Sequence, residues 1–237
     1  MKTLILIPIL NEELNIPVVI QDLLNLRMDL DILFVDDGSV DDSIKVINEF
    51  KGNINLIQRC ATPGIGASML DGFRWAYKNN YDLLIQLDCD GTHPVPFIPY
   101  LIEKATDSKI IICSRWVKGG GMANWPLWRT FLSKGSNRLA ALLLDLEVKD
   151  LTTAFRLYPR KAIELIALRN SMNKDYFYIV EILYLLDKYN FQIEEIPTWC
   201  QDRALGVSKM NLRKILRSVY GLYNLWRNGI KELFNGE

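Results

Sequence analysis

The segment from Leu83 to Asp90 (LLIQLDCD) constrains this chain more than any other stretch. Its first five residues are mostly apolar, which is typical of a buried strand in a parallel sheet. The strand then ends in two carboxylates, Asp88 and Asp90, before the turn-like Gly91–Pro94. Ligands of open α/β sheets bind at this end of the strands, and neighbouring acids repel each other unless a cation lies between them. Carboxylate oxygens favour Mg²⁺ or Mn²⁺. A solvated acidic turn is an equally good reading of this segment alone.

Acidic side chains also follow two earlier predicted strands. Glu12 and Glu13 come shortly after the first strand, and Asp36 and Asp37 end the second. In a parallel sheet the carboxyl ends of the strands meet at one edge, so these acids are expected beside those of the 83–90 segment. Such carboxylates could accept hydrogen bonds from the base and ribose of a nucleotide while a metal holds its diphosphate.

Strand-like apolar runs alternate with helical patterns along most of the chain. We expect strands at about 3–7, 31–35, 55–58, 83–87, 109–114, 150–158 (a turn and then a strand) and 191–198, and helices at about 15–28, 42–50, 64–79, 96–106, 127–144, 160–168 and 178–189. Asn15 is the expected cap of the first helix, Pro8 is expected to end the first strand, and the glycine-rich 115–126 is expected to lack regular structure. The alternation predicts an α/β fold with a doubly wound, mostly parallel sheet flanked by helices.

Composition narrows the possible partners. The chain has 237 residues with 28 basic and 28 acidic side chains, so no overall charge favours nucleic acid. Four widely spaced cysteines indicate reduced thiols in an intracellular protein, and the presence of a single histidine, His93, argues against a zinc site of the usual kinds. No apolar run reaches the roughly 18 residues of a membrane-spanning helix. With no repeat or linker, we expect one domain over 1–237, made of a first half (1–112), a second half (113–207) and a terminal helix (208–237).

Arginines of the second half lie near glycines or turns, at Arg115, Arg129, Arg156 and Arg203. The run from Gln201 to Lys209 also places Arg, Ser and Lys on a loop ahead of a helix. Guanidinium and ammonium groups suit phosphate oxygens. For each residue taken alone, the alternative is an ordinary basic side chain on the surface.

Residues 208–234 have the spacing of an amphipathic helix that is basic on its polar side. Its apolar positions are Leu212, Ile215, Leu216, Val219, Leu222, Tyr223, Trp226, Ile230 and Phe234. Six basic side chains oppose two acids, Glu232 and Glu237. Such a helix suits the surface of an anionic membrane, but docking on its own domain is an equal alternative because periodicity does not say what the apolar face contacts.

Taken in order, these motifs resemble family 2 glycosyltransferases with a GT-A fold. Within that family the chain is most similar to polyprenyl- and dolichyl-phosphate sugar synthases of the dolichol-phosphate mannosyltransferase type. The matching pieces are Pro8–Glu12 (PILNE), Val35–Ser39 (VDDGS), Asp88–Asp90 (DCD), Ser114-Arg115, Asn124–Pro126 (NWP), Asp150–Thr152 (DLT) with Phe155–Tyr158 (FRLY), and Asp202-Arg203 with Gly206, Ser208 and Lys209. The last three point to the polyprenyl-phosphate branch.

The resemblance implies a role for each matching residue. Catalysis is expected from Asp88, Asp90 and Arg203, and a Mg²⁺ or Mn²⁺ ion from Asp88, Asp90 and Thr92. Arg115, Arg129 and Ser133 are implied for the acceptor phosphate. The nucleotide-sugar is expected to contact Pro8, Leu10, Glu12, Val35, Asp37, Asp88, Asp90, Arg203, Ser208 and Lys209.

The chain departs from the usual pattern of that family at several positions. Leu10 stands where a Tyr is common, Thr62 where a Lys is frequent, Val207 where an acid precedes Ser-Lys, and Thr92 where Gln or Ser often occurs. These differences affect the identity of the nucleotide and the sugar more than the type of reaction.

The resemblance therefore implies an inverting, metal-dependent sugar transfer from a nucleotide-sugar, GDP-mannose or a UDP-hexose, to a polyprenyl or dolichyl monophosphate. The enzyme is expected in the cytoplasm, peripheral on the cytosolic face of a membrane, with no nucleic-acid partner. One alternative is a GT-A enzyme that uses a polysaccharide or soluble acceptor, which the basic helix and second-half arginines disfavour. A nucleotidyltransferase is weaker, because Pro8–Leu14 lacks a glycine- and lysine-rich phosphate loop, and a non-catalytic binding module is weaker still.

Overall fold

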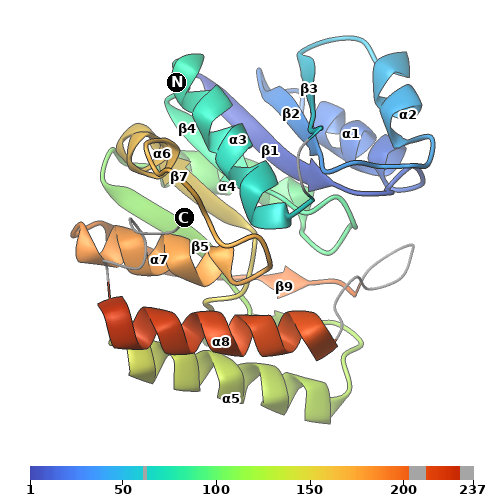
Figure 1. Cartoon of the computed structure of the whole chain (residues 1–237). Helices are drawn as coiled ribbons and strands as arrows, with labels where there is room; N and C mark the ends of the chain where they lie inside the picture. Colours follow the sequence, from blue (N-terminus) through green and yellow to red (C-terminus); the bar gives the residue numbers. More distant parts are fainter. Residues whose placement is uncertain (61–62, 203–211, 230–237) are drawn as a thin grey trace.

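A computed structural model describes residues 1–60, 63–202 and 212–229 of the chain (Figure 1). Within these ranges seven strands form one sheet in the order β3-β2-β1-β4-β7-β5-β8, and two short strands, β6 and β9, form another. The strands are β1 (Thr3–Ile9), β2 (Asp31–Asp36), β3 (Ile54–Gln58), β4 (Leu83–Gln86), β5 (Lys109–Ser114), β6 (Gly121–Met122), β7 (Arg156–Pro159), β8 (Gln192–Pro197) and β9 (Trp199–Cys200). The helices are α1 (Ile16–Asn25), α2 (Ser43–Glu49), α3 (Ile65–Lys78), the 3₁₀ turn η1 (Val95–Phe97), α4 (Ile98–Glu103), α5 (Leu127–Leu144), α6 (Arg160–Ala167), α7 (Tyr178–Lys188) and α8 (Leu212–Asn228).

The sheet is mostly parallel, as predicted. Strands β3, β2, β1 and β4 pair in parallel, as do β5 and β8, and β7 runs antiparallel to both β4 and β5. The α/β fold class and the doubly wound arrangement are therefore confirmed. Because β1, β2 and β4 are direct neighbours, the three acidic segments that follow them lie along the same sheet edge.

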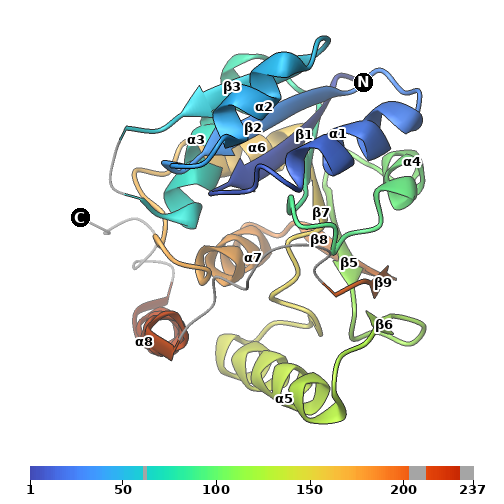
Figure 2. The same ribbon diagram turned by 90° about the vertical axis from the view of Figure 1, so that its right-hand side faces the viewer.

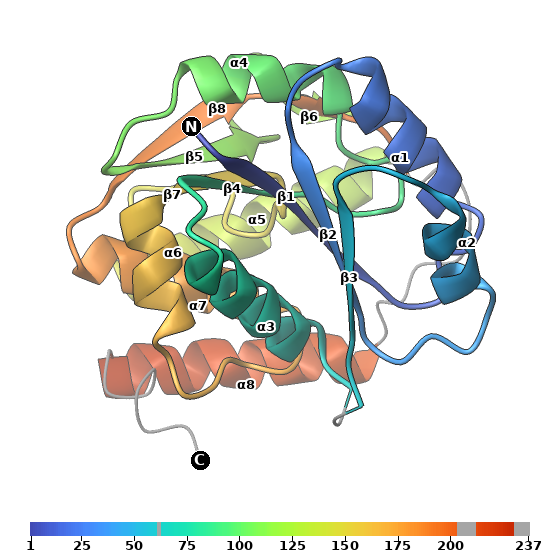
Figure 3. The same cartoon turned by 90° about the horizontal axis from the view of Figure 1, so that it is seen from above.

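Successive residues of β1 point into two separate cores. Leu4 and Leu6 join the core under α3, α6 and α7, whereas Ile5 and Ile7 join the core under α1, α2 and α4. Figure 3 shows these two groups of helices on opposite faces of the sheet. Both faces are apolar because both are covered, which explains why the strands read as continuous apolar runs.

The structure corrects the expected end of the first strand and part of the expected cap of the first helix. Pro8 does not end β1, which pairs with β2 as far as Ile9. The Ile9 carbonyl accepts from the Asp37 amide at 2.9 Å, so the missing N–H of the preceding Pro8 faces away from β2. Asn15 occupies the cap position of α1 but makes no side-chain cap bond. Its amide instead donates to Glu12 Oε2 at 2.7 Å.

The glycine-rich segment 115–126 contains a strand where none was expected. Gly121 and Met122 pair in parallel with Trp199 and Cys200. A Cβ on Gly121 would lie 2.9 Å from the Trp199 ring, so the glycine permits the close approach of the two segments. The partner strand is distant in sequence, which is why composition alone did not indicate the pairing.

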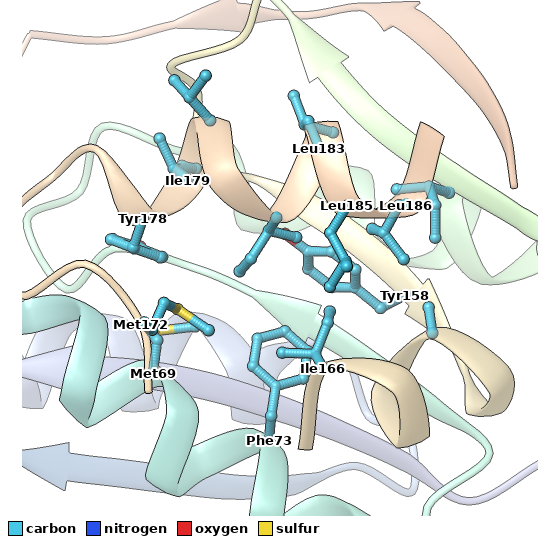
Figure 4. Close-up of a cluster of buried hydrophobic side chains, with 14 of the residues drawn as sticks. Met69, Phe73, Tyr158, Ile166, Met172, Tyr178, Ile179, Leu183, Leu185 and Leu186 are labelled. Carbon is cyan, nitrogen blue, oxygen red and sulfur yellow. The ribbon is translucent and has the colours of Figure 1, made fainter. Parts of the chain in front are cut away.

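A buried polar residue anchors β4 just before the two aspartates. Gln86 is completely buried, and its side chain donates to Tyr178 Oη at 2.7 Å and accepts from Tyr158 Oη at 3.2 Å. Figure 4 shows both tyrosines within the apolar cluster between α3, α6 and α7, where the Tyr158 ring meets that of Phe73 edge to face at 5.1 Å. Buried hydrogen bonds that are all satisfied favour a single arrangement of the core. The two tyrosines therefore fix the position of the end of β4.

The C-terminal helix is present over the part of 208–234 that the structure describes, as α8. Leu225 is buried against the main core and Leu222 packs beside it, and a Cβ on Gly221 would lie 2.6 Å from the Phe177 ring. One side of α8 therefore docks on its own domain. Within the described ranges, no helix combines the length and the apolar character needed to span a bilayer.

Candidate active site

A cavity of about 300 Å³ lies at the shared edge of β1, β2 and β4. It collects acids from all three strand ends, as the sequence predicted. Its lining includes Pro8, Leu10, Glu12, Asp37, Gly64, Asp88, Asp90, Lys174, Asp175, Tyr176, Lys214 and Arg217. The topology thus places residues from the start and the end of the chain around one space.

Asp88 and Asp90 lie at the centre of this arrangement because both also line a second cavity of about 430 Å³. The Asp88 side chain is 37% exposed, whereas Asp90 is buried. The backbone N–H and the hydroxyl of Thr92 both donate to Asp90 Oδ1, at 3.1 and 2.7 Å. Thr92 therefore fixes the orientation of the Asp90 carboxylate, and its predicted role as a metal ligand stays a prediction.

His93 braces the turn that carries the two aspartates. Its Nδ1 accepts from the Asp88 backbone N–H at 3.1 Å, which places its proton on Nε2, and its ring stacks on Phe155 at 5.2 Å. Burial lowers the pKa of His93 to about 4, with Arg115 adding to the effect and Asp90 opposing it. No sequence motif indicates this role for His93, the single histidine of the chain. A neutral, buried imidazole bonded to the Asp88 amide serves to position that residue.

The acidic pair has the donor set of a hard divalent cation. Two carboxylates meet at the cavity, and the described residues contain no cluster of three or more His, Cys, Asp or Glu side chains that could enclose a metal. Mg²⁺ and Mn²⁺ sites commonly use one or two carboxylates and complete their shell with water and substrate phosphates. The two carboxylates therefore fit a hard divalent ion whose shell is completed by water and substrate.

Glu12 and Asp37, the acids that follow β1 and β2, each bond to neighbouring protein groups. Glu12 Oε2 accepts from Asn15, and Asp37 pairs with Arg59 and accepts from the Gly64 N–H at 2.6 Å. Both remain on the cavity lining, as do Pro8 and Leu10. Val35 does not, because it is completely buried in the core. The expectation that Val35 contacts the nucleotide is therefore not supported.

Two basic residues without a predicted site role, Lys214 and Arg217, also line the first cavity. Arg217, on α8, pairs with Asp175 at 3.3 Å, and Lys214 lies 5.1 Å from the centre of the Tyr176 ring. The sequence placed these two basic residues only on the polar side of an amphipathic helix. Their place beside the aspartates depends on how α8 packs, which helical periodicity does not reveal.

The second cavity brings Asp88 and Asp90 together with two of the predicted phosphate ligands, Arg115 and Arg129. Arg115 is held by Asp150, with Nε donating to Oδ2 at 2.8 Å, and its Nη2 also donates to Thr152 Oγ1 at 2.8 Å. Arg129, in the first turn of α5, lies over the Trp125 ring at 3.8 Å. Cationic and acidic groups thus face one another across a single space.

Other predicted site residues lie elsewhere. Ser133 is on α5 and does not line this cavity. Arg156 is completely buried, and its two Nη atoms donate to the carbonyls of Ile179 and Leu151 within the core. Arg203, Ser208 and Lys209, like Thr62, Gly206 and Val207, lie outside the described residues.

The comparison with known protein families identifies the family of the chain. Residues 4–166 match the model of glycosyl transferase family 2, which is more than half of the chain. The chain belongs to glycosyl transferase family 2. This glycosyltransferase is 31% identical over 224 residues to a polyprenol monophosphomannose synthase of Mycolicibacterium smegmatis, covering 92% of this chain and 84% of that protein. It is 30% identical over 214 residues to an undecaprenyl-phosphate mannosyltransferase of Micrococcus luteus, covering 89% and 88%.

Solved structures confirm the GT-A fold of the glycosyltransferase. A glucosyl-3-phosphoglycerate synthase from Mycobacterium tuberculosis, in complex with Mn²⁺, uridine diphosphate and phosphoglyceric acid, superposes with a TM-score of 0.69 and 17% sequence identity. The alignment covers 96% of this chain and 78% of that one. At this level of identity the likeness establishes the fold alone.

Proposed function

We propose that this glycosyltransferase moves a sugar from a nucleotide-sugar to a polyprenyl or dolichyl monophosphate, with inversion at the anomeric carbon and with Mg²⁺ or Mn²⁺. The observation that carries the proposal is that Asp88 and Asp90 line two cavities at once. One of these has the acids and apolar residues expected around a nucleotide-sugar. The other has the two arginines expected around a phosphate. The reacting atoms would meet at the two aspartates.

The chemistry needs no strong base. The acceptor phosphate is already an anion at neutral pH, so its oxygen can form the bond to the anomeric carbon directly. The bond from that carbon to the donor diphosphate breaks, and its electron pair leaves with the nucleoside diphosphate. Because one displacement occurs on the face opposite the leaving group, the configuration inverts. The lowered pKa of His93 agrees with this scheme, since its role is to hold Asp88 and not to take a proton.

The main task of the protein is electrostatic. Two anions must approach each other, and the leaving diphosphate must be stabilised. Arg115 and Arg129 would bind the acceptor phosphate on one side of the aspartates. A divalent ion on Asp88 and Asp90, when bound, would neutralise the diphosphate. Lys214 and Arg217 line the donor cavity and would add positive charge near that group.

The names of the relatives favour mannose as the sugar. Both similar proteins are named for phosphomannose synthesis or mannosyl transfer to polyprenyl phosphates. GDP-mannose is therefore the first donor to test, and a UDP-hexose is the second, since a structure of the same fold holds uridine-diphosphate-glucose. A lipid acceptor also requires the enzyme to work at a membrane surface, which we propose is the cytosolic face.

A substrate panel tests the proposal. The full chain is incubated with GDP-mannose, UDP-glucose or UDP-galactose, a polyprenyl phosphate, and Mg²⁺, Mn²⁺ or chelator, and the lipid product is identified by mass. We expect a polyprenyl-phosphate hexose, formed only with a divalent ion. Transfer to phosphoglyceric acid or a polysaccharide with none to the lipid would overturn the acceptor assignment. Release of pyrophosphate would instead indicate a nucleotidyltransferase.

A further inference from the structure

Helix α5 exposes a continuous apolar stripe on its outer side. Its buried residues, Asn137, Ala140, Ala141 and Leu144, lie on one side of the helix. The opposite side carries large apolar residues at helical spacing, and each is exposed to solvent, namely Leu127, Trp128, Phe131, Leu132, Leu139, Leu142 and Leu143. The outward side of a helix on a globular protein is normally polar. An exposed apolar stripe therefore indicates that this side of α5 contacts a binding partner.

Helix α8 repeats the pattern. Its docked side includes Leu225 and Leu222. Its solvent side carries Ile215, Leu216, Val219, Tyr220, Tyr223 and Trp226, all of them exposed. More than half of the large exposed apolar side chains in the described part of the chain lie on these two helices. Contiguous patches of this kind mark interaction sites.

The two helices form one surface, here called the α5–α8 face, defined by the exposed apolar residues of α5 and α8 named above. The helices contact each other. In Figures 1 and 2 both lie at the end of the molecule opposite α2 and β3. The second cavity adjoins this face, because Arg129 lines that cavity from the first turn of α5.

The charges of these helices all have one sign. Helix α5 carries Arg129, Lys134 and Arg138, and α8 carries Arg213, Lys214, Arg217 and Arg227, with no acidic residue within either helix. The whole chain has equal numbers of basic and acidic residues, so the imbalance is local. Apolar side chains, Trp and Tyr beside basic residues match the interface of an anionic lipid bilayer.

We propose that the α5–α8 face docks on an anionic lipid bilayer, with both helices lying in the plane of the membrane surface. A second copy of the chain fits less well, because a symmetric contact would bring identical positive helices together. The choice of lipid as partner rests in part on the proposed lipid acceptor. Docking would place Arg129 and the second cavity at the headgroup level, where a phosphate anchored by its own lipid tail could enter.

Vesicle co-sedimentation tests the proposal without donor or acceptor. We expect the full chain to bind phosphatidylglycerol-containing vesicles and to bind phosphatidylcholine vesicles at least about tenfold more weakly, with affinity falling as salt is raised. The double variant Trp128→Gln/Phe131→Gln should bind the anionic vesicles at least about tenfold more weakly. Its fold should be intact, because these side chains are 68% and 72% exposed.

Matched control variants distinguish binding through the α5–α8 face from nonspecific binding of exposed apolar or basic residues to vesicles. Val40 and Leu168 are 90% and 66% exposed and lie in connecting segments outside both helices, so Val40→Gln/Leu168→Gln should bind vesicles like the wild type. For charge, Arg138→Gln/Arg227→Gln should weaken binding to anionic vesicles by roughly tenfold or more, whereas Lys51→Gln/Lys161→Gln should not. None of these residues lines either cavity.

Three outcomes would overturn the proposal. The first is a wild-type chain that does not bind anionic vesicles, and the second is a Trp128/Phe131 variant that binds as well as the wild type. The third is a wild-type dimer that becomes monomeric in that variant by sedimentation velocity, which would assign the face to a second copy. A failed sugar-transfer panel with intact, variant-sensitive vesicle binding would overturn the proposed acceptor and leave the docking surface standing.

Discussion

Arg115 and Asp150 form a two-bond ion pair beside the second cavity, with Nε donating to Oδ2 at 2.8 Å and Nη2 donating to Oδ1 at 2.7 Å. Asp150 is completely buried and also accepts from the backbone amides of Thr152 and Thr153. Arg115 itself lines the cavity. The carboxylate therefore sets the direction of a guanidinium that faces Asp88 and Asp90, and one buried acid both closes a turn and orients a site residue.

Replacing Asp150 should lower the stability of the folded protein. In Asp150→Asn the charge of Arg115 loses its buried partner, and breaking such a pair typically costs about 3–5 kcal/mol. We expect a loss of this order in the free energy of unfolding, measured by urea denaturation. The matched control is Asp202→Asn. Asp202 pairs with Arg129 at 3.9 Å with both side chains well exposed, so its loss should cost less than about 1 kcal/mol. Equal effects of the two substitutions would contradict the assignment.

The same pair predicts a dependence of stability on pH. Burial alone would raise the pKa of Asp150, but the hydrogen bonds and charge of Arg115 outweigh it and hold the pKa below its ordinary value of 3.8. A lowered folded-state pKa contributes stability that is complete above the unfolded value and is lost as pH falls through the folded one. The stability gap between wild type and Asp150→Asn should therefore be constant above about pH 5 and narrow below about pH 4. A gap that does not change from pH 6 to pH 2 would argue against the lowered pKa.

Substitutions at Asp90 and Thr92 should distinguish the loss of a carboxylate that would bind the metal from the loss of the hydroxyl that orients this carboxylate. We expect Asp90→Asn to reduce kcat by at least about a thousandfold with an unchanged melting curve, because it removes charge where the diphosphate is stabilised. Thr92→Val removes the hydroxyl donor to Asp90 Oδ1 but keeps the backbone one. It should weaken the apparent affinity for Mn²⁺ by roughly 10-fold to 100-fold. Near-normal turnover of Asp90→Asn would reject the metal role.

Arg129 offers the cleaner test of acceptor binding. Arg115 cannot be removed without disturbing Asp150, whereas the Arg129 side chain is 41% exposed and its ion pair is long. We expect Arg129→Gln to raise KM for the polyprenyl phosphate about tenfold, the value of one charge-assisted contact, and to leave KM for the nucleotide-sugar unchanged. Steady-state kinetics with each substrate varied in turn gives both values. A change confined to the KM for the nucleotide-sugar would show that Arg129 contributes to donor binding and would contradict its assignment to the acceptor phosphate.

Much of the fold follows from local pattern. The strands before the acidic segments, and helix α5 over Leu127–Leu144, lie near the expected positions, because the strands are continuous apolar runs and the helix repeats its apolar residues at helical spacing. The convergence of Glu12, Asp37 and Asp90 was predictable because parallel strands share one carboxyl edge. The β6–β9 pairing was not, since each strand is only two residues long and its partner is far away in sequence.

Local periodicity and short motifs were enough to predict the α/β class, the edge where the acids meet and the resemblance to family 2 glycosyltransferases. Which arginines line the site depends on how the packed chain places each strand end, and local patterns do not specify that. Arg115 follows β5 and Arg156 begins β7, yet Arg115 lines the second cavity and Arg156 is completely buried in the core. Helices α5 and α8 are a second example. Their apolar residues have the spacing of a core-facing helix, but in the folded chain many of them are exposed to solvent. A periodic pattern specifies which side chains share a face, and only the packed chain specifies what that face contacts.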